Sequence, residues 1–216
     1  SFVPTGLSVA DLDGDGKQDL VVNIDQTSQV AIFQNLGAAG IINFAPPVLY
    51  NVSGFAKNTA IVDLDGDMKP DIAVPGETFQ TISILRNTSI PGTISFAPNW
   101  NITSLPGSTN EISIGDLDGD GKADMAVSFN SVNKVGVFRN LSTVGTLAFA
   151  APLNLISNLS SSGVVITDLQ GDGKPDITVT NSAAAAVSVF RNNSTAGSLL
   201  FDAKVDYTTG NNPGLM

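Results

Sequence analysis

Apolar and polar residues alternate along most of the chain with a period of two, and turn-forming residues interrupt the alternation every 8 to 12 positions. This pattern is typical of β-strands, whereas a helix needs apolar residues three and four positions apart. The pattern itself repeats, in units that can be aligned on four acidic segments starting at Asp11, Asp63, Asp116 and Asp168, which are 52, 53 and 52 residues apart. Each unit has room for four strands, so we predict an all-β chain.

The same four strands are expected in every unit, and in the third unit they fall at residues 111–115, 124–129, 134–140 and 146–154. The third strand carries a small residue between branched apolar neighbours, so one face of the sheet is bulky and the other shallow. The small residues are Ala31, Ser83, Gly136 and Ser188. An asparagine ends this strand in every unit, and we expect it to take a left-handed conformation and start a turn. The asparagines are Asn35, Asn87, Asn140 and Asn192.

A sheet with apolar residues on both faces must be covered on both, and repeated four-stranded sheets cover one another when they are arranged radially. The expected fold is therefore a β-propeller of four-stranded antiparallel blades. A linear β-solenoid would need much shorter repeats, and a sandwich would not consist of four near-identical modules. We predict a single propeller region over residues 1–216, with repeat units of approximately 1–54, 55–106, 107–158 and 159–216.

The composition excludes much of enzyme chemistry, because the chain has no cysteine and no histidine. Disulfide frameworks, thiol nucleophiles, histidine zinc sites and imidazole bases are absent for that reason. No apolar run approaches the roughly 18 residues that cross a membrane, so we expect no membrane insertion.

The net charge of −10 would repel nucleic acids and anionic membranes, so neither is an expected partner. The distribution of this charge is more informative than its sum. Of the 20 acidic residues, 15 lie in the four repeated segments. Such concentration is what cation sites require.

Aspartates at positions 1, 3, 5 and 9, with glutamine at position 3 of the fourth segment, place alternate side chains inside a tight loop. Glycines allow the sharp backbone turns. These carboxylates repel one another unless a cation lies between them. Ligation by oxygen alone in an irregular loop favours Ca²⁺ over zinc, copper and Mg²⁺. The carbonyl at position 7 adds a ligand, while the lysine side chain there is expected to point to solvent. We predict up to four calcium ions with these ligand residues: Asp11, Asp13, Asp15, Lys17 and Asp19; Asp63, Asp65, Asp67, Lys69 and Asp71; Asp116, Asp118, Asp120, Lys122 and Asp124; Asp168, Gln170, Asp172, Lys174 and Asp176.

The EF-hand loop begins with similar letters but needs a glutamate at position 12 and flanking helices. Position 12 here is a valine in every unit, which excludes that reading. The four loops are also unequal. Met68 replaces glycine at position 6 of the second loop, and Gln170 replaces aspartate at position 3 of the fourth, so we expect weaker sites there.

The segments DLDGDGKQD and DLDGDGKAD, followed by the strands VAIFQN and VGVFRN, resemble FG-GAP repeats, also called VCBS or integrin-α-like repeats. The resemblance covers essentially the whole chain. It implies a seven- or eight-bladed propeller with calcium in the loop between the first two strands of each blade. Only four blades are present, so either a longer parent chain supplies further blades, or two chains join into one eight-bladed ring, or four blades close alone. The resemblance favours further blades or a homodimer.

The first hypothesis for function is a calcium-stabilised binding or adhesion module that recognises a glycan or an extracellular protein, with structural calcium. Short flexible loops of this kind bind calcium at about 10⁻⁴ to 10⁻³ M, which predicts a secreted or cell-surface location. The alternatives are a non-catalytic spacer and a part of a propeller-type polysaccharide-degrading enzyme. We expect no catalysis by this chain itself, because the acids outside the loops are scattered.

Two further features could serve a ligand. Arg86, Arg139 and Arg191 share one repeat position with Gln34. They either form a ring of ligand-binding cations or, as we expect, cap strand ends or pair with loop carboxylates. Trp100, the single tryptophan, could stack on a sugar or pack within the sheet.

Overall fold

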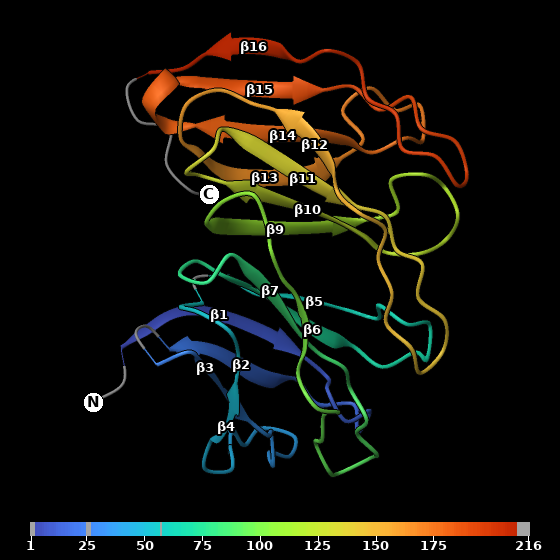
Figure 1. The fold of residues 1–216 in the computed structure, drawn as a ribbon. Helices are drawn as coiled ribbons and strands as arrows, with labels where there is room; N and C mark the ends of the chain where they lie inside the picture. The colour runs from blue at the N-terminus through green and yellow to red at the C-terminus, as the bar shows by residue number, and fades with distance from the viewer. Residues whose placement is uncertain (1–2, 25–26, 57, 211–216) are drawn as a thin grey trace. The chain divides into compact units, whose positions relative to one another are not determined.

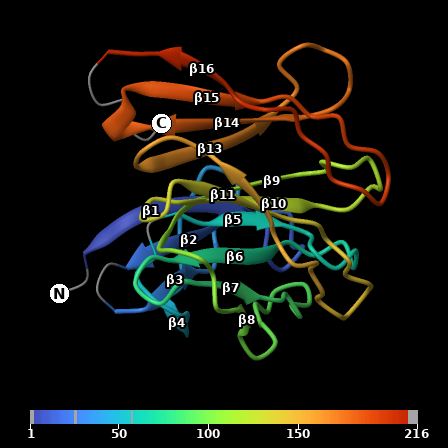
Figure 2. The ribbon, with the colours of Figure 1, turned by 45° about the horizontal axis from the view of Figure 1, so that its top comes forward.

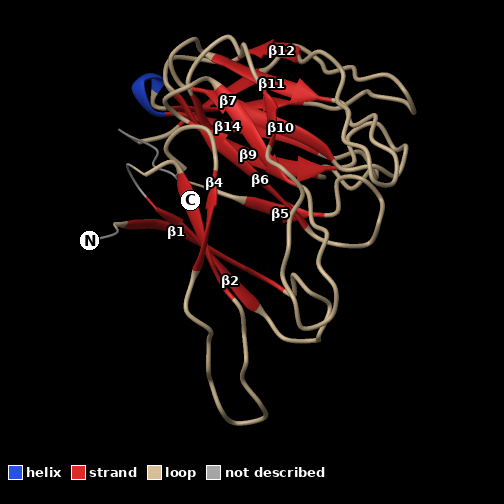
Figure 3. Cartoon of the chain, turned by 60° about the horizontal axis from the view of Figure 1, so that its bottom comes forward, coloured by secondary structure: helices blue, strands red, loops and turns tan. Residues whose placement is uncertain are grey.

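The computed structural model describes residues 3–24, 27–56 and 58–210, and over these residues the chain is built from strands. One short 3-10 helix, η1 (Ser182–Ala184), interrupts the pattern, and Figure 3 shows how strongly strands and loops dominate. The all-β prediction is confirmed. Over the described residues, no helix has the length and apolar character needed to cross a membrane.

The strands form four sheets of four antiparallel strands, each in sequential order (Figure 1). The first two sheets contain β1 (Pro4–Ala10), β2 (Asp19–Ile24), β3 (Gln29–Phe33) and β4 (Val48–Asn51), and β5 (Ala60–Val62), β6 (Asp71–Gly76), β7 (Thr81–Leu85) and β8 (Trp100–Ile102). The last two contain β9 (Thr109–Gly115), β10 (Asp124–Phe129), β11 (Lys134–Phe138) and β12 (Leu153–Ile156), and β13 (Ser161–Thr167), β14 (Asp176–Asn181), β15 (Ala186–Phe190) and β16 (Val205–Thr208).

The chain divides into two compact units, Ser1–Leu105 and Pro106–Met216, and each unit holds two sheets. In the first unit, an apolar core joins Leu12, Val21 and Val30 of the first sheet to Ile72 and Val74 of the second. The prediction of a single propeller region over the whole chain stays a prediction.

The second unit repeats this arrangement. Leu117, Val135 and Val137 of the third sheet share a core with Val164 and Ile177 of the fourth. Each core lies between two successive blades, because a sheet with two apolar faces must be covered on both. In Figure 2, the strand order can be followed from β13 to β16 in the fourth sheet and from β5 to β8 in the second.

The small residues of the third strand lie where the sheet is most tightly filled. At Gly136, an added Cβ atom would lie 2.7 Å from Cε2 of Phe129, so the phenyl ring occupies the space that a side chain would take. Ser83 instead uses its hydroxyl, which donates to Oδ1 of Asn101 in the outer strand at 2.7 Å. The shallow face predicted from sequence therefore holds a ring in one blade and a hydrogen bond in another.

The predicted fourth strand of the third unit, residues 146–154, was wrong. In the structure, β12 begins at Leu153, and the preceding residues form a long loop held by single bridges such as Asn140 to Phe149. The backbone N–H of Thr146 donates to the carbonyl of Thr143 at 2.7 Å, which closes a tight turn where alternation in the sequence suggested a strand. This loop returns toward the acidic end of its blade before the outer strand starts.

Candidate metal centres

The four acidic segments connect the first and second strands of their sheets, and we number them loop one (11–19), loop two (63–71), loop three (116–124) and loop four (168–176). The aspartate at position 9 is the first residue of β2, β6, β10 or β14. Glycines at positions 4 and 6 have positive φ, for example +72° at Gly14 and +85° at Gly16. An L side chain rarely takes this conformation, which explains why glycine is needed at these two turns.

Backbone N–H groups inside the loop point at the first and last aspartates. Oδ1 of Asp116 accepts from Gly119 N at 2.8 Å, and its Oδ2 accepts from Gly121 N at 2.9 Å. Asp124 closes the loop, because its two oxygens accept from Leu117 N at 3.0 Å and Asn140 N at 2.7 Å. The same contacts recur in the other loops, so the carboxylates fix the loop shape as well as its charge.

Three loops bring three carboxylates together, with one oxygen from each residue within 4.8 Å of the others. The groups are Asp11, Asp13 and Asp15; Asp63, Asp65 and Asp71; and Asp116, Asp118 and Asp124. Carboxylate oxygens at this separation fit a hard cation such as Ca²⁺. These three clusters are candidate metal sites. Over the described residues, loop four gathers no such group, and its third position is Gln170.

Burial opposes the negative charge of the last aspartate in the loops. Burial raises the pKa of Asp71 and Asp124 to about 6, and the hydrogen bonds that these carboxylates accept from backbone N–H groups offset only part of the effect. The pKa of Asp19 is raised for the same reason. A carboxylate that is costly to ionise and lies beside two other carboxylates is stabilised by a bound cation.

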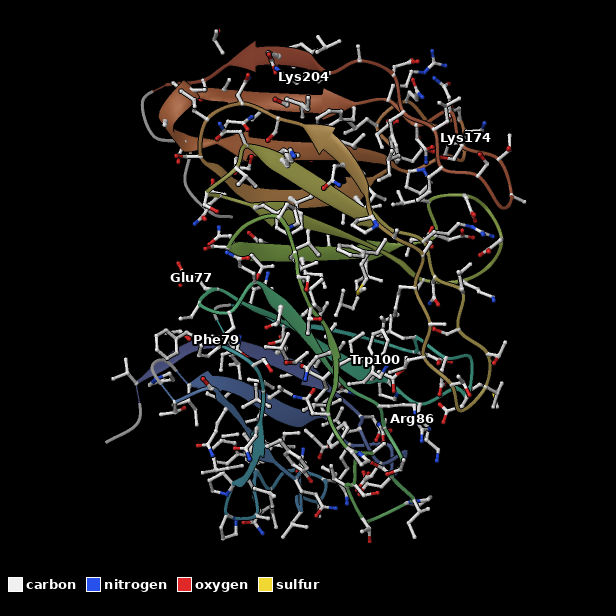
Figure 4. All side chains as sticks on the ribbon, in the orientation of Figure 1. Glu77, Phe79, Arg86, Trp100, Lys174 and Lys204 are labelled. Carbon is white, nitrogen blue, oxygen red and sulfur yellow. The ribbon has the colours of Figure 1, made fainter. Side chains whose placement is uncertain are left out.

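The aspartate at position 3 of loops one to three is buried and paired with the residue that follows the third strand of the same sheet. Nε2 of Gln34 donates to Asp13 at 2.7 Å, and Nε of Arg139 donates to Asp118 at 2.5 Å. Nη1 of Arg86 lies 3.6 Å from Asp65. The expected pairing of these cations with loop carboxylates is confirmed for both arginines (Figure 4 labels Arg86).

Arg191 occupies the equivalent position in the fourth sheet and is exposed. The residue that would pair with Arg191 is Gln170, at position 3 of loop four, and Gln170 carries no negative charge. Trp100 lies in β8 opposite Ile84 and is half-buried, and both readings of its role stay predictions.

The prediction that the lysine side chains at position 7 point to solvent was wrong for Lys17, Lys122 and Lys174. Nζ of Lys122 donates to the carbonyl of Ser142 at 2.8 Å, and Nζ of Lys174, labelled in Figure 4, donates to the carbonyl of Ser194 at 2.9 Å. Nζ of Lys17 binds Asp15 at 2.8 Å and lowers its pKa. Each of these three lysines therefore binds an oxygen atom within its reach, in the same acidic loop or in the segment that follows the third strand.

Met68 adopts φ of +67°, close to the value that the glycines have at position 6, and its side chain is 92% exposed. The carboxylates of loop two still converge. The non-glycine residue is thus accommodated at a conformational cost, which is of the order of 1–2 kcal/mol for an L residue in this region.

The asparagines after the third strands were wrongly predicted to be left-handed turn residues. All four lie in the described part of the chain, and none has a positive φ. Instead, Nδ2 of Asn87 donates to the carbonyl of Leu12 in the preceding blade at 2.8 Å, and Nδ2 of Asn192 does the same to Leu117 at 2.8 Å. The amide thus joins one blade to the acidic loop of the blade before it.

Leu12 and Leu117, at position 2 of their loops, are the residues whose carbonyls these asparagines hold, and their side chains are 1% and 2% exposed. Sequence reasoning missed this contact. The signal was present, because leucine occupies position 2 and asparagine ends the third-strand motif in every unit. Linking the two required knowing which blades are neighbours.

A cavity of about 660 Å³ lies in the second unit between loops three and four. Its lining includes Asp116, Asp118, Asp172, Lys174 and Thr195. Hydroxyl, carboxylate and ammonium groups therefore face a space large enough for a small polar ligand.

Solved structures with the same fold include BBS1N in complex with ARL6DN, with 14% identity and a TM-score of 0.60 over 99% of this chain and 58% of that chain. A proposed 6-phosphogluconolactonase from Bacteroides fragilis has 16% identity and a TM-score of 0.66 over 96% and 56% of the two chains. A catalytically inactive virginiamycin B lyase from Staphylococcus aureus with quinupristin has 11% identity and a TM-score of 0.54 over 97% and 56%. No curated protein matches the chain.

These likenesses define the class as β-propeller, and the chain spans less than 60% of the length of these structures. A model of the FG-GAP-like repeat matches residues 11–74 and 63–127, which together span more than half of the chain. The chain belongs to the FG-GAP-like repeat family.

Proposed function

We propose that this chain is a calcium-stabilised binding module that acts outside the cell and recognises a glycan or a protein. The observation that carries the proposal is the convergence of three carboxylates in each of loops one, two and three. Ca²⁺ would be held by the loop aspartates and the carbonyl at position 7, and it would connect the first two strands of a blade.

The extracellular location is supported by the type of loop. Flexible all-oxygen loops bind calcium at about 10⁻⁴ to 10⁻³ M, a range that is filled outside cells and empty in the cytosol. The burial of Asp71 and Asp124, which raises their pKa values to about 6, further favours a state with bound cation at neutral pH.

The cavity between loops three and four is the place where we expect a polar ligand to bind. Its lining includes Asp172, Lys174 and Thr195, whose polar side chains suit the hydroxyl groups of a sugar or the polar backbone of a peptide. Calcium in loop three would fix Asp116 and Asp118 on the wall of this cavity without contacting the ligand.

Calcium dependence is tested by thermal unfolding in about 10 mM Ca²⁺ and in excess chelator, with Mg²⁺ at the same concentration as a control. A site with a dissociation constant near 10⁻⁴ M contributes roughly 2.7 kcal/mol at a hundredfold excess of ligand. We expect the melting temperature to rise by about 10 °C or more with calcium, since 1 kcal/mol shifts a unit of this size by roughly 4–8 °C. Identical melting curves in calcium and chelator would overturn the metal assignment.

Ligand binding is tested on a glycan array with the calcium-loaded protein and with a Lys174→Ala, Thr195→Ala variant. Binding that this variant loses would support recognition at the cavity. Absence of binding to glycans and to extracellular proteins would favour a spacer, and depolymerisation of a polysaccharide by the purified chain would favour an enzyme.

A further inference from the structure

A cavity of about 280 Å³ lies inside the first unit, between the first blade and the loop that connects β7 to β8 in the second. Its walls include Gln34, Val48 and Tyr50 of the first blade and Gly92 and Thr93 of the second. This volume is smaller than that of cavities that take drug-sized ligands, and it suits one side chain or one small head group.

The second unit fills the equivalent space with an arginine of its own. Residues of the two units correspond at a spacing of 105, so Arg139 stands where the first unit has Gln34. Gly197 likewise corresponds to Gly92. A Cβ atom added at Gly197 would lie 3.6 Å from Nη2 of Arg139. One added at Gly92 would meet no atom of the described residues within 4 Å, so the place of the guanidinium is open in the first unit.

Asp118 shows which carboxylate the missing arginine would contact. Its Oδ2 accepts hydrogen bonds from Nε of Arg139 at 2.5 Å and from Gly197 N at 3.0 Å. Among the described residues, Oδ2 of the corresponding Asp13 accepts a hydrogen bond from Nε2 of Gln34 alone, at 2.7 Å. A carboxylate oxygen has two lone-pair sites, so Asp13 can accept one further donor there.

The first unit also has one positive charge fewer beside its acidic loop. The aspartates of loop three face a lysine and Arg139, whereas those of loop one face Lys17 and the neutral Gln34. Nζ of Lys17 binds Asp15 at 2.8 Å, and Nη2 of Arg139 binds the corresponding Asp120 at 3.1 Å. The lysine thus replaces the arginine at position 5 of loop one, while the buried carboxylate at position 3 has only a neutral amide as its side-chain partner.

Tyr50 gives the cavity an aromatic wall that the second unit lacks, because Leu155 stands at the corresponding position. The ring of Tyr50 is half-buried and packs at 78° against Phe96, with the two ring centroids 5.0 Å apart. An aromatic ring attracts cations that lie over its face, and arginine is found there more often than lysine. Where the second unit has an arginine beside a leucine, the first unit therefore has an amide and an aromatic ring around an open space.

We infer that this cavity binds a guanidinium cation from outside the chain, carried either by an arginine side chain of another protein or by a small alkylguanidinium. The guanidinium would lie beside Tyr50 and Gly92, donate to the amide oxygen of Gln34 and reach Asp13, as Arg139 reaches Asp118. This site is separate from the cavity between loops three and four, and its residues do not need calcium to accept a cation.

Binding is tested by two-dimensional NMR of the isotope-labelled chain, titrated with N-acetyl-arginine amide. The matched probe is N-acetyl-citrulline amide, in which a neutral urea replaces the guanidinium. We expect the backbone amide signals of Gly92 and Thr93 to shift with a dissociation constant of the order of 1 mM, because one ion pair and one aromatic contact supply the affinity. The citrulline probe should bind about tenfold more weakly. Equal binding of the two probes, or no shift with the arginine probe, would overturn the proposal.

Gln34→Arg gives the first unit the residue of the second, so its own guanidinium should fill the cavity. We expect this variant to weaken binding of the arginine probe by about thirtyfold or more, since the site is occupied from within. Gln80→Arg is the matched control, because it changes the net charge equally at an exposed residue between β6 and β7, outside the cavity. Tyr50→Leu should weaken binding by about threefold to tenfold. Circular dichroism checks folding, and unchanged binding in either Gln34→Arg or Tyr50→Leu would contradict the inference.

Two further arms separate the sources of the cation and the role of calcium. Tighter binding of a short arginine peptide than of agmatine would identify a protein side chain as the ligand, and equal or weaker binding of the peptide would identify a small cation. Every titration is made in calcium and again in chelator. Melting curves that do not respond to calcium would overturn the metal assignment alone, because the shift at Gly92 is read independently of them.

Discussion

Loops three and four lie in the same unit and share seven of nine residues, yet their environments differ. In loop three, Asp118 is 4% exposed and accepts hydrogen bonds from Nε of Arg139 and from the backbone N–H of Gly197. In loop four, Gln170 stands at that position and is exposed, and Leu169 beside it is 54% exposed. Position 1 behaves alike in both loops, since Asp168 accepts from Gly171 N at 2.7 Å just as Asp116 accepts from Gly119 N.

The comparison separates two requirements that the repeat combines. The loop shape needs only the first and last aspartates, the glycines and their backbone hydrogen bonds. The cluster of three carboxylates needs an acid at position 3 as well, and burial of that acid depends on the next blade. Loop four therefore has the shape of a metal site without its full set of charges.

The largest effect is expected from removing the residue that both loops need. Asp124→Ala leaves the N–H groups of Leu117 and Asn140 without their acceptor inside a buried site. We expect the free energy of unfolding of the second unit to fall by about 3 kcal/mol, since each unsatisfied buried group costs roughly 1–3 kcal/mol. Urea unfolding followed by circular dichroism measures it. The exposed Asp202 provides the control Asp202→Ala, and similar losses for both variants would show that Asp124 has no special structural role.

The contact between loop three and the fourth sheet is tested next by Asn192→Ala. This change removes bonds to the carbonyls of Leu117 and Pro175, at 2.8 and 2.7 Å. A loss of about 2 kcal/mol in the same experiment is expected because buried carbonyls lose their donor. Asn154→Ala removes an exposed amide on β12 and should cost little. A loss below that of Asn154→Ala would contradict the proposed connection between blades.

Gln170→Asp gives loop four the aspartate that loop three has at position 3. We expect its calcium affinity to rise about tenfold, because the site gains a negative charge and ligand charge tunes such loops. Isothermal titration would detect an additional or tighter site, and Asp118→Gln should weaken one site in the opposite direction. Unchanged titration of both variants would show that position 3 is not a ligand.

Met68→Gly tests the conformational cost in loop two. Since the side chain is 92% exposed and φ is +67°, glycine should relieve strain without removing a contact. The first unit should become more stable by about 1 kcal/mol, as judged by its melting temperature. Met68→Ala keeps the strain and serves as the control; a gain of equal size for alanine would rule out the φ explanation.

The smallest effect is expected from pH in the metal-free protein. The folded-state pKa values of Asp71 and Asp124 are about 6, above the usual value of 3.8, so the folded state holds protons that the unfolded state loses. Their contribution is present below pH 4 and is lost as the pH rises to about 6, so stability should fall over this window. Local opening of the loops should limit the change to the order of 1 kcal/mol.

Melting curves in chelator at pH 4.5 and 6.5 measure this change, and calcium should reverse its sign. Asp206 does not interfere in this window, because Lys204 and Ser188 lower its pKa to about 2 and its titration falls at lower pH. A rise in stability between the two pH values without metal would contradict the expected cost of burying these carboxylates.

Local features of the fold were predictable from the sequence because they lie within one repeat. The alternation gave the sheets, and the position-9 aspartates were correctly placed at the starts of their strands. The fourth strand of the third unit was predicted to begin too early, because the apolar residues at 146–152 lie in a loop and not in a strand. Alternation alone does not distinguish these two uses.

Most of the missed features join residues that are far apart in the chain. Lys122 and Lys174 reach carbonyls 20 residues away, and Asn87 and Asn192 reach the carbonyls of loop leucines 75 residues away. Without the neighbouring blade in view, an asparagine after a strand looks like a turn residue. The ligand identity is likewise outside the repeat, since no residue type in the cavity is particular to one ligand.

The distance of 75 residues between Leu12 and Asn87 also sets an order of events during synthesis. Loop one can form its internal turns as soon as residues 11–19 leave the ribosome, but Leu12 stays uncovered until most of the second blade has followed. Within each unit, the second blade therefore completes the first. While a unit is being synthesised, the leucine of its first acidic loop stays exposed until the asparagine of the next blade has left the ribosome.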